Sequence, residues 1–282
     1  MTVPLTVVAD NTFATPVNQN PLSPGTDLVL HSAPKFLGGH ADAMGGAVCG
    51  DAKLVEPIYH FREITGAMLN PMAAHLLIRG MRTLPLRIRR QKESALCIAR
   101  WLQGQPAAEA AFYPGLESDA NHDIAGRQMR GFGGVLSFML RGGFEAVKQV
   151  LPRLRFAHRA ANLGAVETIA GPPATTNHVE CSPQEREAMG IPEGLIRYSV
   201  GIEDGRQQAN WIACKKKIGL NWCRNREPAC KNARCRGSGE PAHRQNTAYL
   251  HGERRNAAES VAPAGLPEAS GDGSGHGGCA QR

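Results

Sequence analysis

Asp10, Ser32 and Lys35 have side chains that can do chemistry, and each lies at or just beyond the end of an apolar run. A lysine amine can form a Schiff base with an aldehyde, and a carboxylate can keep a pyridine nitrogen protonated. Small hydroxyl residues can hold a phosphate. A strand-end carboxylate followed by a lysine in a Ser- and Gly-containing loop is therefore the set of groups that an aldehyde cofactor requires.

Each of these residues also has an ordinary structural explanation. A lysine close to Gly38-Gly39 is typical of an exposed loop, and Asp10 is typical of a turn or helix cap. The spacing alone leaves both explanations open.

The elements that would position these residues are two short strands. Residues 3–8 and 26–30 are continuous apolar runs, which predicts strands covered on both faces in an α/β sheet. Ligands of such sheets gather at the carboxyl ends of the strands, where Asp10 and Ser32 would lie. The three prolines of residues 12–25 predict a connection with at most a short helix.

The following segments alternate between helical and strand patterns. Residues 52–66 and 70–103 predict helices, with Pro71 at a first helical position. The second stretch has apolar residues spaced for a buried stripe: Leu76, Leu77, Met81, Leu84, Ile88, Leu96 and Ile98. Arg87, Arg89, Arg90 and Lys92 are expected on a solvated helix face rather than at a phosphate site. Beyond residue 107 a mixed α+β layer is predicted. Its strands are residues 108–112, 135–140, 153–158, 165–169 and 196–202, and its helices are residues 121–129, 144–151 and 183–189.

Charge and cysteine change abruptly near residue 204. The formal net charge of +7 arises entirely from residues 205–282, which mix Arg, Gly, Pro and Ser without apolar periodicity. We predict a basic, disordered tail, produced by an altered reading frame or a fusion. Three isolated thiols before residue 204 predict reduced, buried cysteines. A chain start without a basic leader, and no long apolar run, predict a cytoplasmic protein with no membrane partner.

Two other functions of the tail stay open. Cys214, Cys223, Cys230, Cys235 and His243 could bind zinc, but they lack the short Cys-x2–4-Cys spacing of a preorganised site, so no metal is predicted. The basic residues with Trp211 and Trp222 could bind nucleic acid, but without specificity.

Motifs along residues 5–204 resemble a known enzyme family. The chain resembles the trans-sulfuration enzymes that depend on pyridoxal phosphate: cystathionine γ-synthase, cystathionine γ-lyase, methionine γ-lyase and homoserine sulfhydrylase. The matching motifs are Asp10-Asn-Thr-Phe-Ala-Thr-Pro16, His31-Ser-Ala-Pro-Lys-Phe-Leu-Gly-Gly-His40, Leu76-Leu-Ile-Arg-Gly-Met-Arg-Thr-Leu84, Tyr113-Pro-Gly-Leu116, Gln128-Met-Arg-Gly-Phe-Gly-Gly134, Leu163-Gly-Ala-Val-Glu-Thr168 and Leu195-Ile-Arg-Tyr-Ser-Val-Gly-Ile-Glu-Asp204.

The resemblance implies a role for each candidate site residue. Lys35 would form the aldimine with pyridoxal 5'-phosphate and then move protons between substrate carbons. Asp10 would pair with the ring nitrogen, Ser32 would bind the phosphate, and Thr12 would lie near the ring face. The substrate carboxylate would be bound by Arg197, with Thr168 beside it.

The resemblance also implies a reaction class and an assembly. Carbon–sulfur bonds would be broken or made in an amino-acid substrate: cystathionine, homocysteine, cysteine or an activated homoserine. A complete protein would be a homo-oligomer, a tetramer as in the family. Which reaction of the family applies stays open, and a catalytically inactive fragment, at most an assembly module, is the alternative.

The implied fold is an incomplete aspartate-aminotransferase-like type I fold of the α/β class. Residues 1–70 would be the C-terminal part of the cofactor domain, residues 71–204 the small α+β C-terminal domain, and residues 205–282 an unrelated tail. The preceding cofactor-domain segment, which supplies half of the cofactor's enclosure, is expected to be absent. Pro34 stands where the family commonly has threonine, so weaker phosphate binding is expected.

Overall fold

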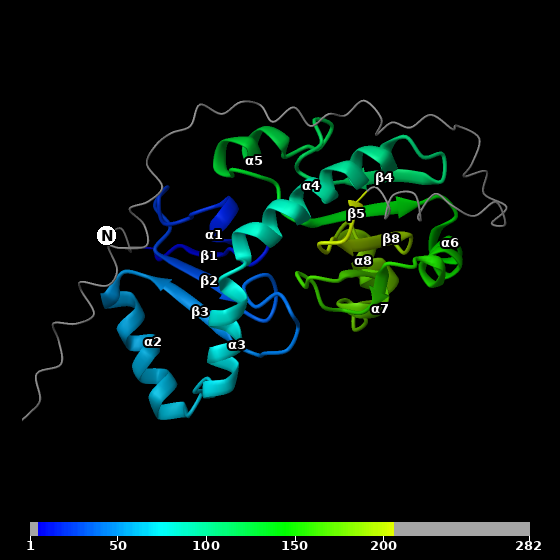
Figure 1. Ribbon diagram of the computed structural model, residues 1–282. Coiled ribbons are helices and arrows are strands. Elements are labelled where there is room, and N and C mark those ends of the chain that lie inside the picture. Colours follow the sequence, from blue (N-terminus) through cyan, green and yellow to red (C-terminus); the bar gives the residue numbers. More distant parts are fainter. Residues whose placement is uncertain (1–4, 206–282) are drawn as a thin grey trace, which may run out of the picture. The chain divides into compact units, whose positions relative to one another are not determined.

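The computed structural model describes residues 5–205 (Figure 1). The predicted tail, with its disorder and its possible zinc and nucleic-acid sites, lies outside the described residues. Two sheets and the helices around them make up the described part of the chain.

The first sheet has three strands in the order β1-β2-β3, formed by Val8–Asp10, Leu28–Ser32 and Gly46–Gly50. The first pair is parallel, with Asp10 opposite Leu30, and the second pair is antiparallel. The short helix α1 (Thr15–Asn18) lies in the connection between β1 and β2. The strand predicted at residues 26–30 is confirmed as β2, two residues later, whereas β1 shares only Val8 with the strand predicted at residues 3–8. Strand β3 was not predicted, because its two glycines weaken the strand pattern.

Three helices follow the first sheet. Helix α2 (Ala52–Thr65) begins at the capping residue Asp51 and ends at Gly66, whose φ of 70° is left-handed. Helices α3 (Pro71–Met81) and α4 (Leu84–Gln103) each have a proline in the first turn. The predicted helical stretch of residues 70–103 is therefore two helices, and Pro71 occupies its predicted position.

The second sheet has five strands in the order β4-β5-β8-β7-β6, all neighbours being antiparallel except β6 and β7. The strands are β4 (Ala108–Phe112), β5 (Val135–Leu140), β6 (Ala157–Arg159), β7 (Thr168–Gly171) and β8 (Leu195–Ser199). Around them lie helices α5 (His122–Gln128), α6 (Gly143–Val150), α7 (Pro173–Thr176) and α8 (Pro183–Ala188), and a 3-10 turn at Leu151–Arg153.

The sequence predicted one half of this sheet, β4 and β5, better than the other, and the predicted strand at residues 196–202 is β8, which ends earlier, at Ser199. Strands β4 and β5 begin and end where we predicted, and α5, α6 and α8 agree to within one residue. The predicted strand at residues 153–158 is wrong at its start, because Pro152 lies in a 3-10 turn and pairing begins only at Ala157. Strand β7 begins at Thr168, later than predicted.

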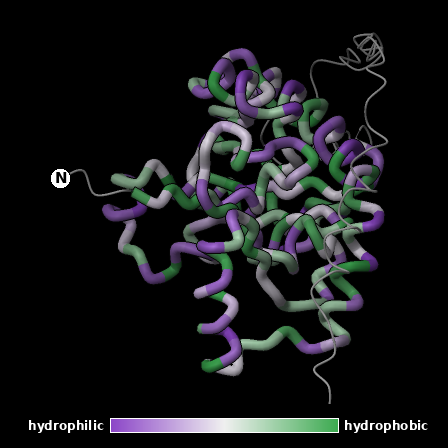
Figure 2. The backbone as a smooth tube through the Cα atoms, turned by 90° about the vertical axis from the view of Figure 1, so that its left-hand side faces the viewer, coloured by the Kyte–Doolittle hydropathy of each residue, from purple (hydrophilic) through white to green (hydrophobic). Residues whose placement is uncertain are grey.

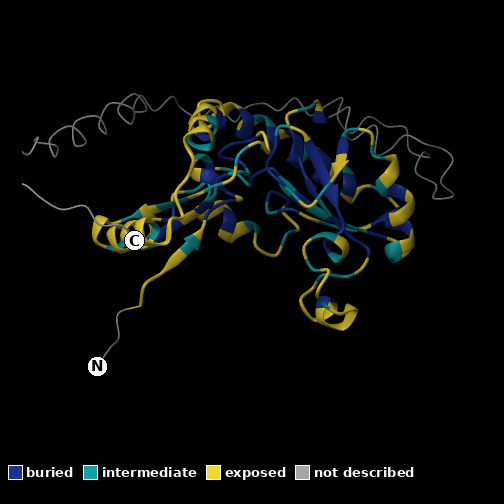
Figure 3. Cartoon of the chain, turned by 90° about the horizontal axis from the view of Figure 1, so that it is seen from below, coloured by how far each residue is buried: buried dark blue, intermediate teal, exposed yellow. Residues whose placement is uncertain are grey.

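Helix α4 packs into both hydrophobic cores. Leu84 and Ile88 join the core under the lysine loop, whereas Ile98 and Leu102 join the core of the five-stranded sheet. Central strands of that sheet are buried, while α2 has no buried residue (Figure 3). The sequence predicted a buried stripe on α3 and α4, and Leu77, Leu84, Ile88 and Ile98 confirm it, whereas Met81 is exposed.

Three expectations about burial are wrong. Strand β1 is not covered on both faces within the described chain: Val7 and Val8 are about half exposed. None of the three cysteines before residue 204 is buried as predicted: Cys49 is exposed, and Cys97 and Cys181 are partly exposed. Arg87, predicted on a solvated face, is only 4% exposed, because its side chain turns inward to backbone carbonyls.

Hydrophobic residues are spread in short stretches along the chain (Figure 2). Among residues 5–205, no helix is both long enough and apolar enough to cross a membrane.

Candidate functional site

Three predicted site residues meet at the carboxyl ends of β1 and β2. Asp10 ends β1 and Ser32 ends β2. Thr12 links them: its backbone N–H donates to Asp10 Oδ1 at 2.9 Å, and its hydroxyl oxygen accepts from the Ser32 N–H at 2.8 Å. Because parallel strands end at the same sheet edge, residues 20 apart in sequence become neighbours.

The Asp10 carboxylate is held in its ionised form. Hydrogen bonds from the Thr12 hydroxyl and the Thr12 backbone lower the pKa of Asp10 from its ordinary value, and the charges of Lys35 and His31 lower it further. Burial lowers the pKa of His31, and Asp10 opposes that shift. Asp10 is exposed at the sheet edge, so its second oxygen can meet a ligand.

Lys35 lies in the turn that follows β2. Its backbone N–H donates to the Ser32 carbonyl at 3.3 Å, and Gly39 donates to the Lys35 carbonyl at 2.7 Å. The side chain is partly exposed, and Nζ lies 5.7 Å from the centre of the Phe13 ring. The positive charge of Lys35 contributes to the lowered pKa of Asp10.

Arg197 lies on β8, in the other sheet. Its guanidinium donates to Asn177 Oδ1 at 2.9 Å, to the Asn162 carbonyl at 3.1 Å and to the Ala161 carbonyl. Burial lowers the pKa of Arg197. These contacts hold the Arg197 guanidinium at the beginning of the segment formed by residues 161–166.

The same segment touches the lysine loop. Val166 N–H donates to the Gly39 carbonyl at 2.8 Å, and a Cβ at Gly164 would lie 2.7 Å from the Phe36 nitrogen. Residues 161–166 therefore connect the loop of Lys35 to the strand of Arg197.

Thr168 is buried, and its hydroxyl has described partners. It donates to Glu203 Oε2 at 2.8 Å and accepts from the Gly201 N–H at 2.9 Å, while the Thr168 N–H donates to Glu203 Oε1 at 2.8 Å. These contacts fix the backbone after residues 161–166. Its contact with substrate stays a prediction.

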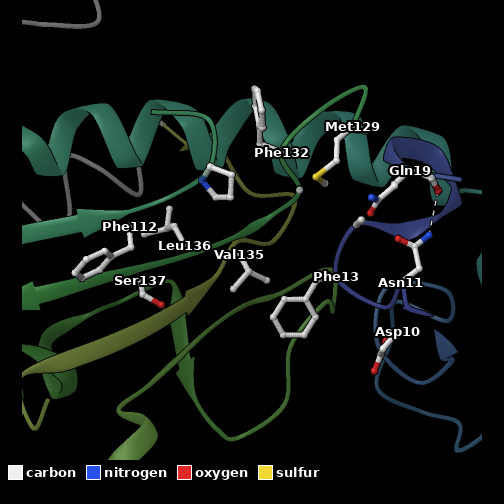
Figure 4. A pocket seen from close by; sticks show the side chains of 13 residues that line it. Asp10, Asn11, Phe13, Gln19, Phe112, Met129, Phe132, Val135, Leu136 and Ser137 are labelled. Carbon is white, nitrogen blue, oxygen red and sulfur yellow. Dashed lines mark hydrogen bonds between the residues drawn. The ribbon is translucent and has the colours of Figure 1, made fainter. Parts of the chain in front are cut away.

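A cavity of about 410 Å³ opens beside Asp10 (Figure 4). Asp10 and Phe13 lie at one end, and Phe112, Leu136 and Ser137 at the other. Lys35, Ser32, Arg197 and Thr168 do not line it. Sequence reasoning did not single out Phe13 or Phe112, although each is 48% exposed here; the position of Phe13 inside the Asp10 motif was the available signal.

These groups fit pyridoxal phosphate in chemical type. The fit rests on an ionised carboxylate for a protonated ring nitrogen, an amine near it, and a hydroxyl residue at the end of β2. Among residues 5–205 no cluster of three metal-ligating side chains is found.

The comparisons with known proteins decide the family. A model of the Cys/Met metabolism PLP-dependent enzymes matches residues 2–208. The chain belongs to this family. Its fold is accordingly part of the fold of those pyridoxal-phosphate enzymes, as the resemblance in sequence implied.

Curated relatives are similar over the same region. Cystathionine gamma-synthase 1 of Arabidopsis thaliana, a chloroplastic protein, is 43% identical over 198 residues, which are 70% of this chain and 35% of the relative. L-methionine gamma-lyase of Fusobacterium nucleatum subsp. polymorphum is 42% identical over 200 residues, 70% of this chain and 51% of the relative. The chain thus spans about half the length, or less, of these relatives.

Solved structures agree. Cystathionine gamma lyase CalE6 of Micromonospora echinospora superposes with a TM-score of 0.71 at 37% identity, over 74% of this chain and 55% of that one. Cystathionine gamma synthase of Xanthomonas oryzae pv. oryzae, in complex with cystathionine, gives 0.71 at 39% identity, over 73% and 54%.

Proposed function

We propose that Lys35 and Asp10 form part of a pyridoxal-phosphate site that makes or breaks carbon–sulfur bonds in sulfur amino acids. The observation that supports this most directly is the ionised Asp10 at the strand end beside the Lys35 loop, in a chain of the Cys/Met metabolism family. The substrate class would be cystathionine, homocysteine, cysteine or an activated homoserine. The choice between lyase and transferase chemistry stays open.

Each residue has a distinct task in this proposal. When bound, pyridoxal phosphate withdraws electrons from the substrate Cα. Lys35 Nζ would hold the cofactor covalently and carry protons to and from substrate carbons, because a lysine amine can serve as both nucleophile and base. Asp10 keeps a proton on the ring nitrogen, and Ser32 donates a hydrogen bond to the phosphate.

Two further residues would bind the substrate. Arg197 offers a planar pair of N–H groups for the substrate carboxylate. To do so it must exchange at least one of its present backbone or Asn177 partners for the ligand. Thr168 would lie beside that carboxylate, and Thr12 near the ring face.

Absorbance spectroscopy tests cofactor binding. We expect the purified chain mixed with pyridoxal phosphate to show a visible absorbance band that Lys35→Ala lacks. Lys53→Ala, which changes an exposed lysine at the start of α2, should keep the band. Equal spectra for the chain and Lys35→Ala would contradict the proposal.

The second candidate is a catalytically inactive module that assembles with a homologous chain. Exposed apolar side chains favour it: Val7 and Val8 on the first sheet, and Phe61 and Ile64 on α2, which are 68% and 86% exposed. We expect the chain to be poorly soluble or to associate with an intact homologue, and the complete protein to be a homotetramer. A compact, monodisperse monomer in sedimentation would contradict this expectation.

We also propose the division and location of the chain. Residues 1–70 would be the end of a cofactor domain and residues 71–204 a small domain, with α4 packed into both cores. Limited proteolysis that releases a stable piece ending near residue 70 would support this boundary. A cytoplasmic location, without membrane or specific nucleic-acid partners, can be tested by cell fractionation.

A further inference from the structure

Arg87 on α4 is an unusual buried cation. Its guanidinium uses four of its five N–H donors: Nε bonds to Thr83 Oγ1 at 3.1 Å, and the terminal nitrogens bond to three carbonyls. Those carbonyls are Phe36 at 2.8 Å, Leu37 at 3.1 Å and Gly80 at 3.0 Å. Every acceptor is neutral, and within residues 5–205 no carboxylate forms an ion pair with it. Burial lowers the pKa of Arg87.

A buried, unpaired charge destabilises a fold unless its hydrogen bonds are made. Two of the bonds go to Phe36 and Leu37, the residues that directly follow Lys35. Both are buried in an irregular turn, where no helix or strand supplies donors to their carbonyls. Arg87 therefore satisfies two adjacent buried carbonyls from a residue 50 positions away.

Glycines make this approach possible. A Cβ at Gly39 would lie 2.3 Å from a terminal nitrogen of Arg87, and one at Gly80 would lie 2.2 Å from the Gly38 carbonyl. The loop and helix α3 are thus in contact through backbone, with the guanidinium filling the remaining space. A side chain at either glycine would push them apart.

The loop is held from the other side as well. The Phe36 backbone nitrogen and ring lie against Gly164, and Gly39 accepts from Val166. Phe36 itself is fully buried. Lys35 directly precedes this buried part of the turn and is itself partly exposed.

We propose that Arg87 is a positioning residue, whose contacts with Phe36 and Leu37 set where the Lys35 amine lies relative to Asp10. This inference rests on the proposed function for its chemical meaning. The clamp, by which we mean the hydrogen bonds from Arg87 to the Phe36 and Leu37 carbonyls, can be measured without any cofactor. Arg87 would act through the backbone and would touch neither cofactor nor substrate.

Hydrogen exchange measures the clamp directly. The Gly38 and Gly39 amides donate to the Ala33 carbonyl at 2.8 Å and the Lys35 carbonyl at 2.7 Å, so they report opening of the lysine turn. In Arg87→Lys the charge remains, but a single ammonium cannot reach three carbonyls in a planar fork. We expect exchange at both amides to become at least about tenfold faster.

Two controls separate positioning from general destabilisation. Arg89→Lys changes an exposed arginine of the same helix and should leave both amides unchanged. Ile98→Val loosens the core at the far end of α4, and should speed exchange in the five-stranded sheet more than at Gly38 and Gly39. In Arg87→Ala, added ethylguanidinium should restore protection. If the Arg87 variants do not fold, Thr83→Val, which removes the Nε acceptor and the hydroxyl's own hydrogen bond to the Gly80 carbonyl but leaves the bonds to Phe36 and Leu37, should give a smaller increase at the same amides.

The link to Lys35 is tested by trapping. Wild type and Arg87→Lys are mixed with pyridoxal phosphate, reduced with borohydride, and the label at Lys35 is measured by peptide mass spectrometry. We expect about tenfold less label in Arg87→Lys, with recovery by ethylguanidinium in Arg87→Ala.

Each result has a defined meaning. Unchanged exchange at Gly38 and Gly39 in Arg87→Lys, or changes that merely match Ile98→Val, would overturn the inference. Faster exchange with undiminished label at Lys35 would overturn it too, because the amine would not depend on the clamp. If wild type itself takes no label at Lys35, the proposed cofactor binding fails, and the exchange measurements still decide whether Arg87 fixes the turn.

Discussion

The two sheets of this chain differ in how completely they are packed. In the five-stranded sheet Phe138, Ile196 and Tyr198 are at most 1% exposed, whereas Val7 and Val8 beside the candidate site are about half exposed. The well-packed sheet carries Arg197, and the more exposed one carries Asp10, Ser32 and the turn of Lys35. The residues proposed to bind the cofactor therefore lie in the less completely packed sheet, and Arg87 and residues 161–166 connect them to the better-packed part.

The largest expected effect tests this difference in packing. Phe138→Ala should lower the free energy of unfolding by about 3–5 kcal/mol, because the ring is fully buried and leaves a cavity. Val8→Ala should change it by less than about 0.5 kcal/mol, since the side chain is already half in water. Urea denaturation of both variants measures the contrast, and equal losses would refute it.

The contact between α3 and the lysine loop should be sensitive to one methyl group. Gly80→Ala places a Cβ 2.2 Å from the Gly38 carbonyl, so we expect a loss of about 1–3 kcal/mol. Gly126→Ala is the matched control, because a Cβ there, in α5, meets nothing within 4 Å. Thermal unfolding that shows the control to be the less stable variant would contradict the close contact.

Cofactor affinity should respond to the residue before the lysine. Pro34→Thr adds a hydroxyl and a backbone N–H. One hydrogen bond from either group to the phosphate would strengthen phosphate binding about tenfold. Titration with pyridoxal phosphate measures the change. Pro34→Val, which restores the N–H without the hydroxyl, shows which group is responsible.

The smallest effect concerns pH. Because the folded-state pKa of Asp10 is lowered, its contribution to stability is fully present above the ordinary value near 3.8 and is lost as pH falls through the lowered value. Thr12→Val removes the hydroxyl hydrogen bond and should move that loss to higher pH. Carboxyl chemical shifts from NMR would show the change, and an unaltered titration in Thr12→Val would contradict the assigned cause.

Local sequence patterns predicted most helices and strands, but they did not predict contacts between residues far apart in the sequence. β4 and β5 were found because their apolar runs are bounded by turn residues, and Pro71 marked a helix start. Strand β3 was not predicted because Gly46 and Gly50 interrupt the apolar pattern of a strand. It forms because it pairs with β2. The motif around Lys35 predicted the gathering of Asp10, Thr12 and Ser32 through the parallel strand ends.

The burial of Arg87 could not be predicted from the sequence. Arg87 and Arg89 lie two positions apart in one basic stretch, yet the first is buried and the second exposed. The difference depends on the carbonyls of a loop 50 residues away, which no helical periodicity contains. For the same reason, the spacing of residues in the sequence could not predict that residues 161–166 contact both Gly39 and Arg197.

The most direct test of the central claim is covalent capture of pyridoxal phosphate by Lys35. The protein is incubated with the cofactor, reduced with borohydride and digested, and the modified lysine is identified by mass spectrometry. The account predicts label concentrated on Lys35, and a loss of the visible absorbance band in Lys35→Ala. Label spread over exposed lysines such as Lys53, with no band that depends on Lys35, would contradict it.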